Sequence, residues 1–299
     1  FSVLQMSEHG KVVNSGEVRA TGRLADITSG GEFTNDGLLS LGGGNIPTYN
    51  TGSFTLRPVY VTDSESKFIN NGVYNINARH AYPTKETNGT IYGVYLLNNA
   101  LATNYGLINS GYWGGGVYAK EFSGMIKSVV VESNSQFINS STGSISLGVD
   151  SNGVSESYLS SGSAAIQANT DGKALNEGLI TLNTMADGVY GFIANGKNIE
   201  MVNVGTIDVN SDGNGGQYTP NQSIGIYTQN GATGIIDNRG SINLNGANNI
   251  GIKAVGGGIA SSSGVINVNK ASGQSTLPNY GVWVEDTGSQ VEIAGTVNL

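Results

Sequence analysis

Short runs of alternating apolar and polar residues recur along the whole chain, and each follows a glycine. In "KALNEGLITLN", Asn176 and Gly178 precede Ile180 and Leu182, which lie on either side of polar Thr181. The same arrangement follows glycines from one end of the chain to the other: Gly16, Gly37, Gly72, Gly106, Gly143, Gly178, Gly205, Gly240, Gly264 and Gly295. Alternation with a period of two predicts a short β-strand with one apolar face and one polar face.

Two further segments of each repeat also predict strands. An apolar residue lies two positions before the asparagine, as at Phe33, Phe68 and Phe137. A third segment reads glycine, apolar, any residue, apolar, or close to it, at 92–96, 115–119, 188–192, 224–228, 250–254 and 280–284. No segment has the periodicity of an amphipathic helix. Three strands in each of about ten repeats predict an all-β fold, a right-handed parallel β-helix whose stacked coils bury a continuous core.

The asparagine and the glycine predict how each coil turns a corner. Glycine supplies a positive φ or lets two backbones approach closely, and asparagine hydrogen-bonds the local backbone. Ser262 and Ile293 replace the asparagine in two late repeats. We therefore expect a ladder of stacked, hydrogen-bonded amides that ends near Asn238, formed by Asn14, Asn35, Asn70, Asn104, Asn139, Asn176, Asn203 and Asn238.

The repeats indicate one β-helical unit over residues 1–299. The chain starts at Phe1 without a leader and stops at Leu299 inside a repeat, so we interpret it as a segment of a longer protein. Uneven spacing of the repeats predicts loop insertions near 42–66, 77–91, 148–163 and 211–222. Loops on a rigid scaffold are common places for binding.

Aromatic residues supply the candidate binding groups. Most tyrosines precede residue 119, and aromatic side chains on exposed loops are good interface anchors and sugar platforms. Other tyrosines are expected to fill the core, Tyr74 above all, or to stack along the outside of the helix. The candidate binding residues are Tyr49, Tyr60, Tyr82, Tyr112 and Trp113.

Composition restricts the possible partners and chemistry. The formal net charge is −8 with only 14 Lys and Arg, which argues against nucleic acid or an anionic membrane surface as a partner. There is no cysteine and no run of 18 apolar residues. His9 and His80 are the only histidines, with no serine-hydrolase motif beside them. We therefore expect no metal, no cofactor and no enzyme activity. The alternative is a polysaccharide-degrading enzyme on the same β-helix fold, which would need two carboxylates facing one groove.

Two stretches carry a family resemblance, "NRGSINLNGANNIGIKAVGGG" and "NEGLITLNTMADGVYGFIANG". They resemble passenger domains of monomeric (type V) autotransporters, in particular the large fusobacterial outer-membrane adhesins. The resemblance implies a monomeric β-helical stalk outside a Gram-negative cell, either secreted or anchored through a translocator domain that this chain lacks. Such a stalk would bind a host-cell or bacterial surface protein or glycan, without direct membrane contact of its own. A passive stalk with its binding site elsewhere is the other possibility.

Overall fold

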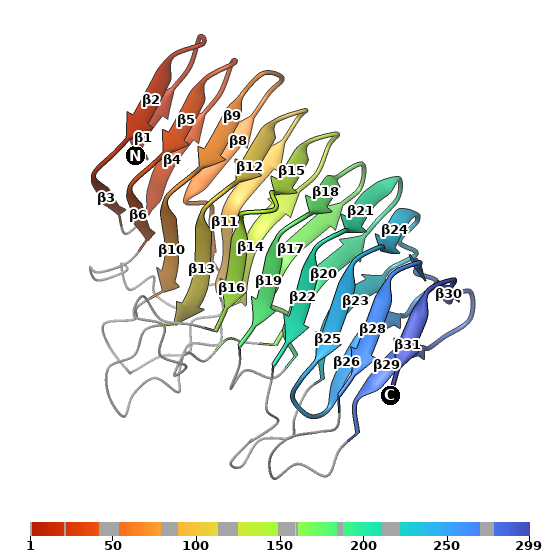
Figure 1. The fold of residues 1–299 in the computed structure, drawn as a ribbon. Helices are drawn as coiled ribbons and strands as arrows, with labels where there is room; N and C mark the ends of the chain where they lie inside the picture. The colour runs from red at the N-terminus through yellow and green to blue at the C-terminus, as the bar shows by residue number, and fades with distance from the viewer. Residues whose placement is uncertain are drawn as a thin grey trace.

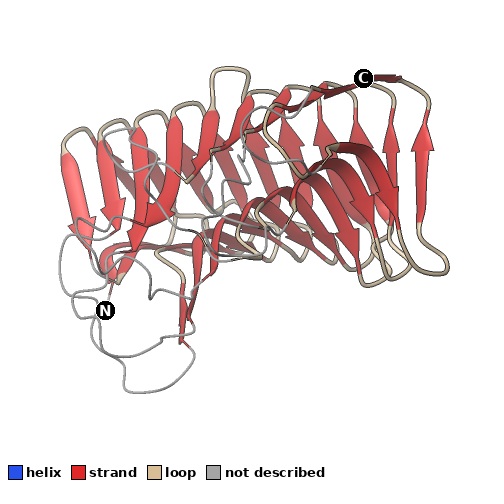
Figure 2. Cartoon of the chain, turned by 90° about the horizontal axis from the view of Figure 1, so that it is seen from below, coloured by secondary structure: helices blue, strands red, loops and turns tan. Residues whose placement is uncertain are grey.

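The predicted all-β architecture is confirmed. The structure, a computed structural model, describes residues 2–20, 22–41, 54–78, 89–112, 125–148, 159, 161–183, 188–210, 222–269 and 278–299. In these ranges the chain forms the strands β1 to β31 and no helix (Figure 2). Every strand pairing is parallel, between one coil and the next, and three sheets result. The molecule is an elongated right-handed parallel β-helix with its termini at opposite ends (Figure 1).

Each coil gives one strand to each of three sheets. Sheet A contains β1 Ser2–Met6, β4 Arg23–Ile27, β8 Val59–Thr62, β11 Gly89–Leu97, β14 Met125–Val131, β17 Ala164–Asn169, β20 Tyr190–Asn195, β23 Ser223–Gln229, β26 Asn249–Ala254 and β29 Tyr280–Val284, with β7 Phe54–Leu56 also paired to β11. Sheet B contains β2 Lys11–Asn14, β5 Glu32–Asn35, β9 Lys67–Asn70, β12 Leu101–Asn104, β15 Gln136–Asn139, β18 Lys173–Asn176, β21 Ile199–Asn203, β24 Gly234–Asn238, β27 Ile259–Ser262 and β30 Gln290–Ile293. Sheet C contains β3 Glu17–Ala20, β6 Leu38–Leu41, β10 Val73–Ala78, β13 Leu107–Tyr112, β16 Ser144–Leu147, β19 Leu179–Leu182, β22 Thr206–Val209, β25 Ser241–Leu244, β28 Val265–Val268 and β31 Thr296–Asn298.

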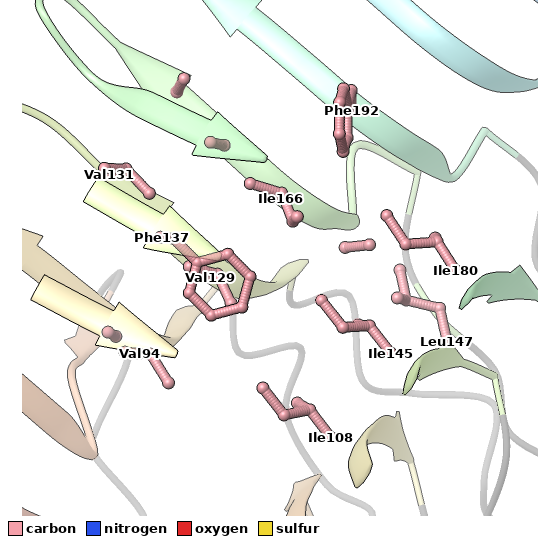
Figure 3. Packing of buried hydrophobic residues seen from close by; sticks show 14 of the residues in the cluster. Val94, Ile108, Val129, Val131, Phe137, Ile145, Leu147, Ile166, Ile180 and Phe192 are labelled. Carbon is pink, nitrogen blue, oxygen red and sulfur yellow. The ribbon is translucent and has the colours of Figure 1, made fainter. Parts of the chain in front are cut away.

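The inward side chains of the three sheets form one continuous core. Ile108, Ile145 and Ile180 are paired in register on successive strands of sheet C and are fully buried. They face side chains of the other two sheets, among them Phe137 and Ile166 (Figure 3). Burying such a side chain stabilises the fold by about 1.5–3 kcal/mol. Stacking identical positions therefore gives each coil the core that it could not form alone.

The buried asparagine ladder runs as the sequence predicts. The Nδ2 of each asparagine donates to the Oδ1 of the asparagine one coil further on, at 2.7–2.8 Å, from Asn14 to Asn238. Asn238 then donates to the Oγ of Ser262 at 3.1 Å, so a hydroxyl accepts the last bond. The ladder fixes the corner between sheets B and C in every coil that it crosses.

Close backbone approach, rather than a positive φ, explains the repeated glycine. A Cβ added to Gly178 would lie 2.2 Å from the carbonyl oxygen of Gly143, and one added to Gly205 would lie 2.1 Å from that of Gly178. Neither glycine has a positive φ. Any larger residue at these corners would separate two coils that the sheets hold about 4.8 Å apart. The glycine is therefore a spacing requirement.

Sheet A bends along a line of small residues. Gly93 and Val94 both face the interior. The hydroxyl of Tyr74 donates a hydrogen bond of 2.9 Å to the carbonyl oxygen of Gly93. Tyr74 is fully buried, which confirms its predicted core position. Ser128 takes the glycine position on β14 and shares a hydrogen bond of 2.7 Å with buried Ser110. Ser110 is the one polar residue in an expected apolar position, and this bond satisfies it.

The strand expected at 115–119 lies outside the described residues, and β14 occupies that place in sheet A.

Candidate functional site

The three corners of the coil differ in the length of chain that they contain. The connection from sheet A to sheet B has three to five residues, and the one from B to C has two residues in all coils but one, where it has four. The connection from C to the next strand of A varies from two residues, between Ala20 and Arg23, to sixteen, between Leu147 and Ala164. Chain beyond the regular repeat therefore leaves the solenoid at one corner, which we call the variable corner.

The expected insertions all include this corner. Most residues of the insertions near 42–66, 77–91, 148–163 and 211–222 lie outside the described residues. Within the first of them, residues 54–62 contain β7 and β8, which are regular strands of sheet A. The described strands on either side of each insertion nevertheless show where it begins and ends on the solenoid.

Tyrosines and an arginine gather on the outer face of sheet A, where the chain returns from the variable corner. We call Arg57, Tyr60, Tyr92 and Tyr95 the tyrosine–arginine cluster. Tyr60 and Tyr95 are paired in register, with ring centroids 5.8 Å apart and planes 11° from parallel. The Tyr92 and Tyr95 centroids are 5.5 Å apart. The guanidinium carbon of Arg57 lies 4.4 Å from the Tyr95 centroid and 5.9 Å from that of Tyr92. Such aromatic and cation–π contacts each contribute about 0.5–1.5 kcal/mol.

Tyr60 is the one predicted binding residue whose side chain the structure describes. Its ring is partly exposed, packs on Tyr95, and has the Arg23 guanidinium 4.9 Å from its centroid. Arg23 is also paired with Asp26 at 2.9 Å. Neighbouring groups thus occupy part of the faces of the Tyr60 ring. The sequence-based alternative, in which tyrosines stack along the outside of the helix, describes this residue.

The other predicted binding residues cannot be placed beside Tyr60. Tyr49, Tyr82 and Trp113 lie outside the described residues, and Tyr112 ends β13 with its side chain outside them as well. Sequence reasoning did not single out the partners of Tyr60. A usable signal existed, because Tyr60 and Tyr95 are separated by 35 residues, the same offset as Asn35 and Asn70 of the ladder.

A carboxylate stabilises the cluster from the next coil. The Tyr95 hydroxyl donates to Oε1 of Glu132, and Nδ2 of Asn169 donates to Oε2 of Glu132 at 2.8 Å. Burial, together with this carboxylate, raises the pKa of the Tyr95 hydroxyl well above its usual value. Glu132 is therefore engaged by the phenol and the amide, and the phenol stays protonated.

The cluster region contains two cations, Arg57 and Lys127, that have no ion pair within the described part of the chain. The Nε of Arg57 is buried and has no hydrogen-bond partner there. Lys127 pairs in register with Tyr92, is buried, and donates to the carbonyl oxygen of Gly162. Burial lowers the pKa of Lys127 to about 8. Arg57 and Lys127 therefore bring two cations to a cluster that contains one carboxylate, Glu132, on a chain of net charge −8.

A second aromatic group lies further along the same face of sheet A. Tyr190 and Tyr227 have ring centroids 5.0 Å apart, and Lys253 has its Nζ 5.4 Å from the Trp283 centroid. Lys253 is paired with Glu285 at 3.2 Å, so its charge is compensated. The two groups therefore differ in electrostatics: Lys253 has an ion pair, whereas Arg57 and Lys127 have none in the part of the chain that the structure describes.

The described residues do not assemble a recognisable catalytic or metal centre. His9 is exposed, and its Nδ1 lies 3.8 Å from an oxygen of the equally exposed Glu65. His80 lies outside the described residues. No three His, Cys, Asp or Glu side chains of the described ranges come together as a metal site, and no helix in those ranges could cross a membrane.

Comparisons of the chain with protein-family models, with curated proteins and with solved structures gave no match.

Proposed function

We propose that this chain is an adhesive segment of a bacterial surface protein, a passenger segment of the type V autotransporter kind. In this proposal the β-helix is a rigid stalk outside a Gram-negative cell. Its binding groups attach to a protein or glycan on host cells or on other bacteria.

The observation that carries the proposal is the concentration of length variation at one corner, directly beside the tyrosine–arginine cluster. The corner between sheets B and C varies by only two residues, and the amide ladder and the glycine contacts repeat along it. The variable corner has no such constraint, so sequence can change there without loss of the core. Binding residues commonly lie on loops that a rigid scaffold positions.

The charge of the cluster favours a ligand with an anionic group. A guanidinium binds a carboxylate or sulfate through two parallel hydrogen bonds, and the buried Nε of Arg57 has no partner among the residues that the structure describes. Buried Lys127, one coil beyond Tyr92, is a second cation without an ion pair in the described ranges. The partly exposed Tyr60 and Tyr92 add hydroxyl edges that can donate or accept hydrogen bonds.

The proposal is tested by binding of the labelled chain to epithelial cells, to bacterial cells and to an array of acidic and neutral glycans. Arg57→Ala is expected to weaken binding to the acidic ligand roughly tenfold, the effect of losing about 1.4 kcal/mol. Tyr105→Ala is the matched control, because Tyr105 is 49% exposed at the corner between sheets B and C, away from the cluster. Absence of binding by the unaltered chain to all surfaces would favour a passive stalk. Equal loss in both variants would argue against the cluster.

A further inference from the structure

A stripe of aliphatic and threonine side chains runs along the outer face of sheet B. Its residues occupy the same register position on seven successive strands, β2 to β21. We call them the aliphatic stripe: Val13, Thr34, Ile69, Thr103, Ile138, Leu175 and Val202. Val13 is 62% exposed, the members from Thr34 to Leu175 are partly exposed, and Val202 at the end of the stripe is buried. Outward positions on a solvated sheet face are normally polar, so the stripe needs an explanation.

The stripe has a defined end. The next residue in register on β24 is Asp237, which is paired with Arg239 at 2.8 Å and accepts a hydrogen bond from Ser261 at 2.9 Å. The stripe itself is therefore limited to the N-terminal seven coils, although the neighbouring column continues on β24 with Ile235, which is 50% exposed. A bounded apolar patch with a polar border is typical of a contact surface.

A column of charged residues runs beside the stripe on the same strands. In register order it reads Lys11, Glu32, Lys67, Leu101, Gln136, Lys173 and Glu200. Lys11 and Glu32 form an ion pair at 3.2 Å, and Lys173 and Glu200 form one at 3.9 Å. The column thus has an oppositely charged pair at each end and uncharged Leu101 at its centre.

We infer that this face of sheet B binds the same face of a second copy of the chain, with the two solenoids antiparallel. A two-fold axis along β12 places Lys11 opposite Glu200 of the second copy and Glu32 opposite Lys173 of the second copy. The same axis places Leu101 against its own counterpart, and the aliphatic stripe of one copy lies on that of the other. Isologous contacts of this kind require a surface that complements itself.

The parallel arrangement fits the charges less well. With the axis along the solenoid, Glu32 would face Asp36 of the second copy, and the pairing of Lys11 with Glu200 would be lost. The antiparallel arrangement has one unfavourable contact on each side of the axis, between Asp36 of one copy and Glu177 of the other, but both residues are exposed at the corner, where water screens them. Two complementary charge pairs on each side of the axis therefore favour the antiparallel order.

The size of the surface sets the expected strength. Six coil spacings of about 4.8 Å give a length of about 29 Å, and a four-residue strand gives a width of about 13 Å. This footprint is smaller than the roughly 800 Å² per partner of a standard interface. We expect weak dimers that form as concentration rises.

Sedimentation velocity over a wide concentration range tests the inference. The unaltered chain is expected to change from monomer to dimer, and Ile138→Lys is expected to raise the dissociation constant tenfold or more. Leu179→Lys is the control, because Leu179 is 38% exposed on sheet C, outside the proposed contact. A chain that stays monomeric at every concentration, or a dimer that Ile138→Lys leaves intact, would overturn the inference.

A charge exchange tests the antiparallel order separately. Lys11→Glu and Glu200→Lys are each expected to weaken the dimer, because each puts like charges opposite one another twice. The double variant restores both contacts and is expected to recover the dimer. Unchanged thermal unfolding of all three variants would show that the fold is intact. A double variant as weak as the single ones would exclude the antiparallel pairing.

Discussion

At the residue scale, one corner explains why asparagine and glycine recur together. Asn104 donates to Oδ1 of Asn139 at 2.8 Å, to the carbonyl oxygen of its own corner at Gly106 and to that of Ser144 in the next coil, while its Oδ1 accepts from Asn70. A buried amide with every partner supplied costs little, whereas an unsatisfied one costs about 1–3 kcal/mol. The glycine lets the coils approach closely enough for these bonds to form.

Gly178→Ala is expected to destabilise the protein strongly. The new methyl group would lie 2.2 Å from the carbonyl oxygen of Gly143 and 2.3 Å from that of Ser140, and backbone atoms cannot move aside without separating the coils. We expect a loss of about 3 kcal/mol in thermal or denaturant unfolding. Gly16→Ala is the matched control, because the same methyl would meet nothing within 4 Å. Equal effects of the two substitutions would show that the contact does not matter.

Lys127 predicts a dependence of stability on pH. Burial lowers the pKa of Lys127 from 10.5 to about 8, so the folded protein binds fewer protons than the unfolded chain between these values. The penalty for burying the charge is fully present below pH 8 and is relieved as pH rises from about 8 to 10.5, so stability rises across this window. Lys127→Met is expected to be more stable at pH 7, by about 3 kcal/mol at most. Unfolding measured from pH 7 to 10 should show the advantage shrink; a constant difference would contradict the assignment.

At the scale of the strand, sequence predicted sheets B and C better than sheet A. Asparagine and glycine mark the corner between B and C, and the alternation of β19 or β22 can be counted from that marker. Five strands of sheet A lack a comparable marker. In register with Gly93 they have Val3, Leu24, Pro58, Ser128 and Ala165. The glycine pattern therefore does not predict those strands.

The tyrosine–arginine cluster was predictable only in part. Tyr60 is recognisable as an aromatic outside the core pattern, but its contacts come from β11, one coil away. Which residues meet across coils depends on the lengths of the connections, and those vary most at the corner beside the cluster. Whether Arg57 forms an ion pair depends in turn on where each carboxylate points, which no repeat motif specifies.

Ile207→Asp tests the inward and outward assignment of a strand. Ile207 is fully buried on β22, and a carboxylate there would have no cation beside it, so we expect a loss of several kcal/mol. Thr206→Asp on the same strand is the control, because Thr206 is partly exposed and faces outward. Thermal unfolding that is unchanged by Ile207→Asp would show that the strand is in the wrong register.

At the scale of the whole molecule, the solenoid separates what holds it together from what can change. The core, the amide ladder and the glycine contacts all repeat from coil to coil, and the two corners that join these strands vary by at most two residues in length. The third corner has connections from two to sixteen residues with no break in sheet A or sheet C. Stability and surface diversity thus reside in different parts of each coil.

Exchanging connections between corners tests this separation. Replacing residues 210–222, which join β22 to β23, with residues 245–248, which join β25 to β26, keeps an asparagine in the position of Asn210 and is expected to leave the fold intact. Shortening the connection should stabilise the protein by about 1 kcal/mol at most, because loop entropy grows slowly with length. Inserting residues 210–222 after Val204 is the contrasting variant, since the N–H groups of Val204 and Gly205 both donate to the carbonyl oxygen of Asn176 at that corner. We expect this insertion to lower the midpoint of thermal unfolding strongly or to prevent folding. Circular dichroism measures both effects. If the two corners tolerated their changes equally well, the amide ladder would not constrain the coil.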